Sequence, residues 1–223
     1  IQHSDSDHMT QRKRLPIGIQ TFREIREDNH YYVDKTQLAL NLIEDGKHYF
    51  LSRPRRFGKS LLLDTLKELF EGNEPLFHGL AVHNQWNWSV KYPVLRFSFS
   101  GEKFQDEQGL PNILDAQLSR MEEAYDIKQR FDHVGGRFSD LLIKIHQQTG
   151  HPVVVLVDEY DKPILDNIDQ PEIAAQIREG LKNLYSVMKG QDAYIRFIFM
   201  TGVTKFSKVS LFSGVNQIED ITL

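Results

Sequence analysis

The chain has 223 residues and no cysteine, with 27 Lys and Arg against 31 Asp and Glu, for a formal net charge of −4. This length, with 40% hydrophobic residues, predicts a globular protein of one full domain or two small ones. The lack of cysteine excludes disulfides and thiol chemistry, and the acidic balance argues against a broad basic surface for nucleic acid. No apolar run reaches the length of a membrane span and no signal peptide is evident, so we expect a cytoplasmic protein.

The N-terminal region carries little functional signal. Residues 1–8 are polar and unpatterned, and we interpret them as a remnant of an expression tag joined at Met9. Residues 9–47 are expected to form an arm with a first helix over TQLALNLIE, capped by Asp34. Four side chains of this arm either join the core, which we favour, or wall a nucleobase pocket: Phe22, Ile25, Tyr31 and Tyr32.

Residues 48–71 predict a strand, a loop and a helix in the order of a phosphate-binding loop. HYFLS reads as the strand, and the run that begins SLLLDTLKELF has apolar residues at helical spacing. Gly58 would let the backbone approach phosphates, Lys59 would reach the β and γ phosphates, and Ser60 would place its hydroxyl on Mg²⁺. A Gly-Lys-Ser/Thr tripeptide arises by chance in roughly one chain in ten of this length. The flanking strand and helix therefore carry the prediction.

The loop departs from the usual pattern at Arg53, where a glycine is expected. A non-glycine residue forced into the left-handed region costs about 1–2 kcal/mol. Because Pro54 biases Arg53 toward extended backbone, we expect Arg53 to end the strand, outside the tight turn. Arg55 and Arg56 either add positive charge near an anion or lie solvated on the surface. The predicted nucleotide-binding loop comprises Arg53, Pro54, Arg55, Arg56, Phe57, Gly58, Lys59, Ser60 and Leu61.

In the middle of the chain, predicted strands alternate with predicted helices. A packed, irregular connection after residue 71 leads to a second strand over 93–99, and helices are expected over 111–126 and 137–148. The run PVVVLVD at 152–158 predicts a third strand, and its VVVLV segment is apolar throughout, as in a strand covered on both faces. The alternation predicts an α/β fold, a three-layer sandwich with a mainly parallel, five-stranded sheet flanked by helices.

The third strand runs into two acids, Asp158 and Glu159. In P-loop proteins Asp158 would hold Mg²⁺ through water and Glu159 would orient and polarise the attacking water. In that class the acidic strand lies next to the phosphate-loop strand or, in the additional-strand type, is separated from it by one strand. The alternative is an acidic turn in which Asp161 caps the segment before Pro163.

The last part of the chain supplies a helix over 171–188 and strands over 194–202 and 217–223. An intervening strand usually carries a polar residue at its tip, where it can touch the γ-phosphate or the water. Thr201 is the candidate and Thr204 the second choice, although a threonine before a Gly202 turn is also ordinary. The histidines show no metal-ligand spacing, which argues against a transition-metal site.

Long runs of the sequence are similar to a known family. They occur in order between Leu15 and Leu223: LPIGIQTFREIRE, YYVDKT, RPRRFGKSLLL, LFHGL, YPVLRFSFS, VVVLVDEYDKP and TGVTKFSKVSLFSGVNQIEDIT. Together they resemble the AAA-ATPase-like family of prokaryotic proteins, in which this domain typically precedes a predicted PD-(D/E)XK nuclease-like domain. No trustworthy nuclease motif occurs within the 223 residues.

The resemblance implies a P-loop ATPase core of the additional-strand, AAA-like type over 48–223. It implies ATP and Mg²⁺ as ligands, residues 53–60 as the phosphate loop, and Asp158 and Glu159 as the acidic pair. It also implies that an arginine at position 53 is usual in the family and is not a sign of a degenerate loop. A fifth core strand at the end of the chain would leave the module without a helical lid, and we expect slow turnover as a result.

Three functions remain open at this point. The first is a Mg²⁺-dependent ATPase module that powers or gates a C-terminal effector. The second is a switch that binds nucleotide with negligible hydrolysis and acts through a partner. The third, direct binding of nucleic-acid phosphates by Arg53, Arg55 and Arg56, would make binding steeply salt-dependent and is disfavoured by the acidic balance. ATP is favoured over GTP because no guanine-reading Asn-Lys-x-Asp stretch is present.

Overall fold

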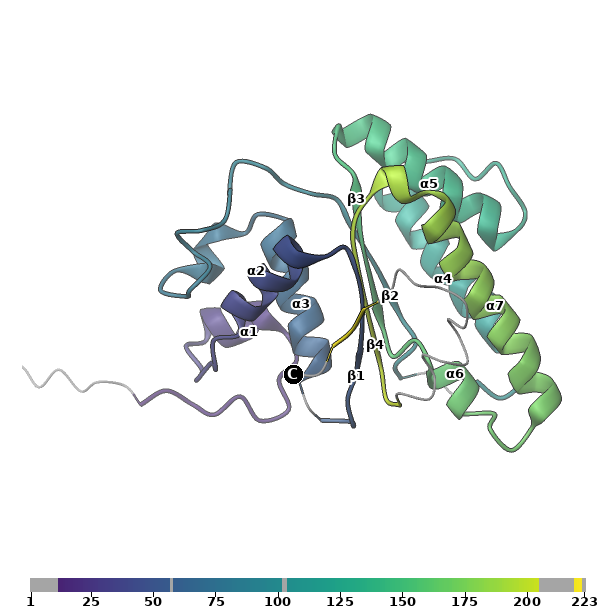
Figure 1. Cartoon of the computed structure of the whole chain (residues 1–223), viewed down its shortest axis with the longest axis horizontal. Coiled ribbons are helices and arrows are strands. Elements are labelled where there is room, and N and C mark those ends of the chain that lie inside the picture. Colours follow the sequence, from purple (N-terminus) through teal and green to yellow (C-terminus); the bar gives the residue numbers. More distant parts are fainter. Residues whose placement is uncertain (1–11, 57, 102–103, 205–218, 222–223) are drawn as a thin grey trace, which may run out of the picture.

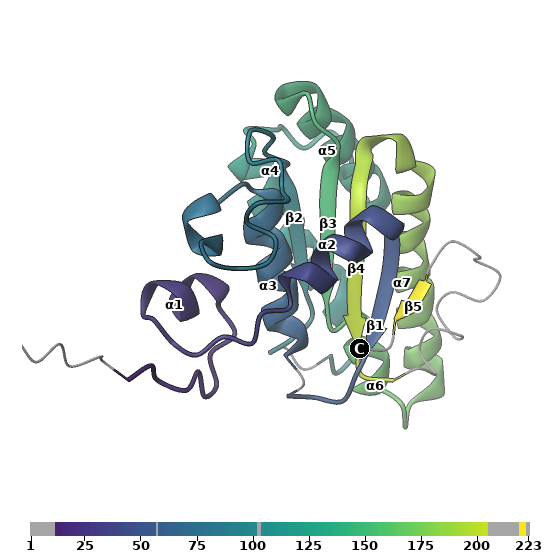
Figure 2. The ribbon, with the colours of Figure 1, turned by 60° about the vertical axis from the view of Figure 1, so that its left-hand side comes forward.

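The computed structural model describes residues 12–56, 58–101, 104–204 and 219–221. Its centre is a sheet in the order β2-β3-β4-β1-β5, and every paired neighbour is parallel (Figure 2). The strands are β1 His48–Ser52, β2 Val94–Ser98, β3 Val153–Asp158, β4 Ile195–Gly202 and β5 Glu219–Ile221. The predicted strand over 217–223 is described only for these last three residues, which pair with β1 at the edge of the sheet.

Helices cover both faces of the sheet (Figure 1). On one side lie α1, α2 and α3, and on the other lie α4, α5 and α7. The helices are α1 Phe22–Glu27, α2 Thr36–Asp45, α3 Lys59–Phe70, α4 Gly109–Ala124, α5 Val134–Thr149, α6 Lys162–Leu165 and α7 Pro171–Gly190, with 3₁₀ turns η1 Glu74–Phe77 and η2 Asp192–Tyr194. The four strands β1–β4, all parallel and flanked by helices, confirm the α/β prediction.

The strand order places β4 between β1 and β3. The acidic strand β3 therefore does not pair with the phosphate-loop strand β1, so the interpretation that makes them direct neighbours is wrong. Leu51 is in register with Thr201, and Ser98 is in register with Asp158. Because parallel strands end at the same edge of a sheet, the loops after β1, β3 and β4 come together there.

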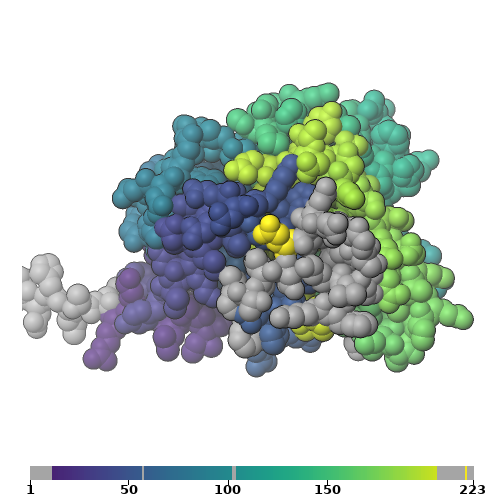
Figure 3. Space-filling model, viewed as in Figure 1, coloured from purple at the N-terminus to yellow at the C-terminus, as the bar shows by residue number. Residues whose placement is uncertain are grey.

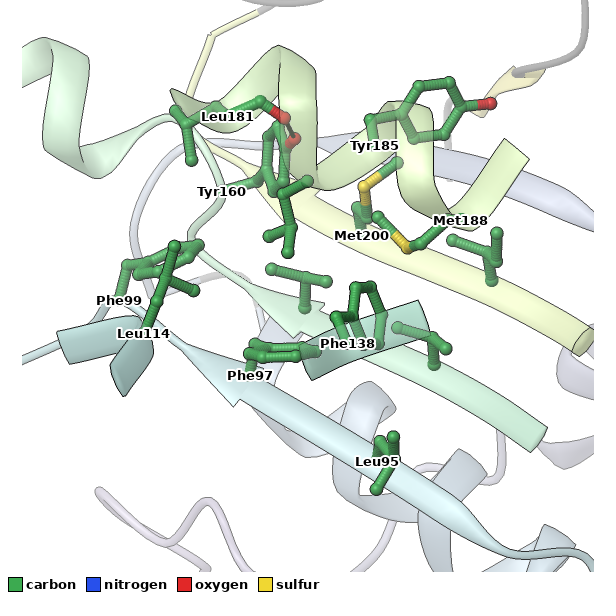
Figure 4. Packing of buried hydrophobic residues seen from close by; sticks show 14 of the residues in the cluster. Leu95, Phe97, Phe99, Leu114, Phe138, Tyr160, Leu181, Tyr185, Met188 and Met200 are labelled. Atoms are coloured by element: carbon green, nitrogen blue, oxygen red, sulfur yellow. Dashed lines mark hydrogen bonds between the residues drawn. The ribbon is translucent and has the colours of Figure 1, made fainter. Parts of the chain in front are cut away.

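Each face of the sheet has its own apolar core. One core lies against α4, α5 and α7, where Phe97, Phe138 and Met200 are fully buried (Figure 4). In the same core the Tyr160 hydroxyl donates to the main-chain carbonyl of Leu181. The other core lies against α1–α3, and its centre includes Phe70. Burial on both faces explains the uninterrupted apolar run of β3.

The N-terminal arm is more structured than the sequence indicates. Its helix α1 is not expected from the sequence, and Phe22 and Ile25 of this helix are buried. Helix α2 begins at Thr36, and Asp34 accepts hydrogen bonds from the Thr36 backbone N–H (2.8 Å) and hydroxyl (2.6 Å). Asp34 thus stabilises the start of the helix from one position before the N-cap, Lys35.

Seen from the side of Figure 1, β5 reaches the molecular surface beside the blue residues that belong to the β1 region (Figure 3), as its edge position requires. Among the residues that the structure describes, no helix has both the length and the apolar composition needed to cross a membrane.

Candidate functional site

The loop after β1 makes the tight turn predicted for it. The non-glycine residue with a left-handed backbone is Arg56 and not Arg53. Arg56 and Gly58 have positive φ angles of 69° and 75°, and Arg53 is not among the residues with positive φ. The Arg53 N–H donates to the Gly202 carbonyl (3.1 Å) and so extends the pairing of β1 with β4. Arg53 therefore ends the strand, as the proline argument predicts, and the cost of about 1–2 kcal/mol falls on Arg56. Phe57 lies outside the described residues.

Lys59 begins α3 and turns its ammonium back over the loop. Its Nζ donates to the carbonyl oxygens of Arg53 and Gly202, the second at 2.8 Å, and only 6% of the residue is exposed. Burial lowers the pKa of Lys59, while the nearby carboxylates of Asp161 and Glu159 oppose the shift. The lysine thus joins the loop after β1 to the end of β4.

Three predicted site residues from three elements share one hydrogen-bond group. The Ser60 hydroxyl donates to Asp158 Oδ2 (2.7 Å), and the Thr201 hydroxyl donates to Asp158 Oδ1 (2.8 Å). Thr201 also accepts from the backbone N–H of Glu159 (3.0 Å). Asp158 and Thr201 are almost fully buried, so these bonds hold the carboxylate in one orientation. Ser60, Asp158 and Thr201 are brought together as the sequence predicts.

Glu159 follows Asp158 in an unusual backbone conformation, with φ at 52°. The N–H bond to Thr201 holds this turn. The side chain is partly buried, and burial followed by the charge of Asp158 raises the pKa of Glu159. The structure therefore places a carboxyl group with a raised pKa beside Asp158 and Lys59.

Asp161 has a role that the sequence interpretation missed. It occupies the N-cap position of α6 but makes no side-chain cap bond, so the alternative in which its side chain caps this segment is wrong. Its fully buried carboxylate instead accepts from the backbone N–H groups of Val203 (2.9 Å) and Thr204 (3.1 Å). Asp161 thus ties the loop after β3 to the loop after β4. Of the two candidate threonines, Thr204 donates its backbone N–H to Asp161, whereas Thr201 donates its hydroxyl to Asp158.

Arg96 is a second residue that sequence reasoning missed. It lies on β2, and its Nη2 is 3.9 Å from Asp158 Oδ2. The other terminal nitrogen, Nη1, donates to Asp64 Oδ1 of α3 (3.1 Å). The sequence signal is a charged residue between the apolar residues Leu95 and Phe97 of a strand.

An apolar pocket of about 420 Å³ lies beside the start of α3. Gly58 and Leu61 form one side, and Tyr31 and Tyr32 of the N-terminal arm line another. Phe22 is a core residue, as favoured, while both tyrosines face this pocket. A larger cavity of about 770 Å³ between α4, α5 and α7 contains none of the predicted site residues.

The oxygen atoms at the site fit Mg²⁺. Within the described ranges no group of three or more His, Cys, Asp or Glu side chains could hold a metal ion by itself. Mg²⁺ is commonly bound by one or two carboxylates together with water and substrate phosphates. Ser60 and Asp158, 2.7 Å apart through their oxygens, supply donors of the right kind beside a helix N-terminus.

Comparison with known proteins matches the chain to a family described as predicted AAA-ATPase, over residues 16–212. The chain belongs to this family. The region that matches the predicted AAA-ATPase family includes the loop after β1 and the ends of β3 and β4. The chain is also 60% identical over 213 residues to an "Uncharacterized protein in vnfD 5'region" of Azotobacter chroococcum mcd 1. That match covers 95% of this chain but 41% of the relative, so the chain spans less than half of the relative's length.

Proposed function

We propose that the chain is an ATP-binding, Mg²⁺-dependent ATPase module of the additional-strand P-loop type. One observation carries the proposal: Ser60 of the phosphate loop donates to Asp158 of the acidic strand, and Thr201 of the strand between them donates to the same carboxylate. These residues come from distant parts of the chain, and the sheet brings them to one edge. Membership of the predicted AAA-ATPase family supports the same conclusion.

The phosphates would bind at the N-terminus of α3, where free backbone N–H groups and the helix dipole favour an anion. Lys59 would exchange its two carbonyl partners for phosphate oxygens. Arg55 adds positive charge nearby, because it acts electrostatically on both Lys59 and Glu159. The base would occupy the pocket between Leu61 and the two arm tyrosines, in which apolar walls suit a flat ring.

Hydrolysis would depend on positioning and charge. Glu159 would accept a proton from the attacking water or orient it, and Thr201 fixes the backbone from which Glu159 projects. Ser60 and Asp158 would hold Mg²⁺, which when bound neutralises charge on the phosphates. No covalent intermediate with the protein is needed.

The test is calorimetric titration with ATP and Mg²⁺, followed by a steady-state assay of phosphate release. Lys59→Ala is expected to abolish ATP binding, because its ammonium lies at the start of α3, where the phosphates would bind. Glu159→Gln is expected to bind ATP as the wild type does and to release phosphate at least about 100-fold more slowly, a typical loss when a general base is removed. Arg130→Ala, which removes an exposed cation paired with the buried carboxylate of Asp140, is the matched control for loss of a cation.

Two outcomes would contradict the proposal. ATP affinity unchanged in Lys59→Ala would show that the loop does not bind the phosphates. Tight binding without sustained phosphate release would instead favour the nucleotide-dependent switch. The assay is best repeated on a full-length protein, because the matched relative is more than twice as long as the region aligned.

In a longer protein, this module would power or gate a C-terminal effector domain of the nuclease-like kind, and any nucleic acid would be bound by that domain. The cytoplasmic location expected from the sequence stays a prediction.

A further inference from the structure

A line of alternating charges runs from Asp158 to the N-terminal arm. Arg96 places Nη2 3.9 Å from Asp158 Oδ2 and donates from Nη1 to Asp64 Oδ1 at 3.1 Å. The second oxygen of Asp64 accepts from the backbone N–H of Phe22 at 2.6 Å. Asp64 is thus bonded on one side to α1 and on the other to the guanidinium.

The two contacts of Arg96 differ in kind. At 3.1 Å the contact with Asp64 is a hydrogen-bonded ion pair, whereas 3.9 Å is too long for a hydrogen bond to Asp158. The side chains of Asp158, Asp64 and Arg96 are 4%, 13% and 28% exposed, so water screens their charges only in part. Arg96 is therefore anchored by Asp64 and acts on Asp158 through its charge.

We infer that Arg96 is a positioning residue that competes with Mg²⁺ for Asp158, and that Asp64 limits this competition by drawing the guanidinium toward itself. This inference rests on the proposed function. Asp158 Oδ2, the oxygen nearest Arg96, is also the oxygen that Ser60 contacts. A positive charge held there weakens binding of a cation at the same carboxylate. Removing the charge of Arg96 should therefore strengthen Mg²⁺ binding, and removing the charge of Asp64 should weaken it.

Asp64 is also linked to the wall of the apolar pocket, because it binds the backbone N–H of Phe22. The Phe22 ring packs edge-on against the Tyr32 ring, with centroids 5.3 Å apart, and Tyr32 lines the pocket. A change at Asp64 can therefore weaken contacts with the base as well. Such a loss would be the same with and without Mg²⁺, and it cancels when the two affinities are divided.

The experiment measures the Kd of ATP by calorimetry or by a fluorescent ATP analogue, first with EDTA and then with excess Mg²⁺. The ratio of the two values is the gain that Mg²⁺ provides. A unit charge within about 4–6 Å shifts an ionic equilibrium by roughly one to three powers of ten. We expect Arg96→Met to increase the ratio about tenfold, Asp64→Asn to decrease it several-fold, and Arg96→Lys to stay within about twofold of the wild type.

A purely structural ion pair would behave differently, because both substitutions would then lower ATP affinity in both conditions and leave the ratio unchanged. Arg130→Met, which removes the exposed partner of the buried Asp140 carboxylate, is the control and should leave the ratio as in the wild type. An unchanged ratio in Arg96→Met, or a change of the same sign in Asp64→Asn, overturns the inference while the ATPase proposal stands. A wild-type chain that binds no ATP overturns both. Should Arg96→Met fail to fold, Asp64→Asn and Arg96→Lys decide the question by the same ratio.

Discussion

Glu159 combines two unfavourable conditions at one residue. Its backbone is left-handed at φ 52°, and its carboxylate is partly buried next to that of Asp158. Both cost folding free energy, and the hydrogen bond from its N–H to Thr201 offsets part of this cost. Strain of this kind at the end of a core strand is typical of residues held in place for chemistry.

The raised pKa of Glu159 predicts a pH-dependent difference in stability between the wild type and Glu159→Gln. The folded state penalises the charged carboxylate, so no penalty exists well below the ordinary pKa of 4.5, where the group is protonated in both states. The penalty develops as the pH rises from that value through the raised pKa. Glu159→Gln should therefore be more stable than the wild type at neutral pH and gain nothing at low pH.

Urea unfolding of both proteins between pH 4 and 8 measures this difference. Glu123→Gln, a change at an exposed glutamate of α4, is the control. A difference between wild type and Glu159→Gln that does not vary with pH would contradict the burial argument.

The sequence predicted the site residues that depend on local motifs. Lys59 and Ser60 follow a strand and begin a helix, while Asp158 and Glu159 end an apolar strand, so neighbours in the chain identify them. Asp161 and Arg96 could not be found this way. Their partners are Val203 and Asp64, about 40 and 30 residues away, and only the packing of elements brings them together.

Among the secondary-structure elements, the end of β4 packs so closely against its neighbours that Gly202 has no room for a side chain. A Cβ added to Gly202 would lie 2.5 Å from Phe50 Cζ and 3.0 Å from Asp161 Oδ2. The Gly202 carbonyl also accepts from Lys59 and from the Arg53 N–H. The missing side chain at this residue lets three segments of the site meet.

Gly202→Ala is therefore expected to lower the free energy of unfolding by about 1–3 kcal/mol, as overpacking of a core commonly does. Gly190→Ala is the matched control, because it ends α7 and an added Cβ there would meet nothing within 4 Å. This control should be neutral or slightly stabilising. Equal stability of the two variants in urea would rule out the steric explanation.

Most elements were predictable because each has its own periodicity. The strand over 48–52 agrees with β1 in both bounds, and the expected helix over 171–188 corresponds to α7. Helix α1 was missed, since its N-cap Thr21 makes no side-chain cap bond and its first N–H is satisfied by Asp64, far away in sequence. A short helix stabilised by such a distant contact leaves no local pattern.

At the scale of the molecule, the site belongs to both halves of the chain. The loop after β1 comes from the first third, and the ends of β3 and β4 come from the last third. The order of the strands, which places β4 between the other two, could not be derived from their sequences alone, because the buried apolar residues of each strand suit any position inside the sheet. Long-range pairing of this kind is decided by the packing of the whole sheet.

A ligand that joins these parts should stabilise the entire fold. ATP with Mg²⁺ at about 100 times its Kd would add about 2.7 kcal/mol, which for a chain of this size raises Tm by roughly 5–10 °C. Differential scanning fluorimetry measures the shift. Lys59→Ala should lose it, while Arg130→Ala should keep it. A shift that Lys59→Ala retains would place the nucleotide elsewhere.

The contact between Lys59 and Arg53 also bears on how tolerant the loop is to sequence change. Lys59 binds the main-chain carbonyl of Arg53, and every amino acid has that group. The contact is therefore indifferent to the side chain at position 53, provided that the backbone stays extended. A sequence pattern that demands glycine there would overlook loops built like this one, so such searches are better anchored on Gly58 and the residues after it.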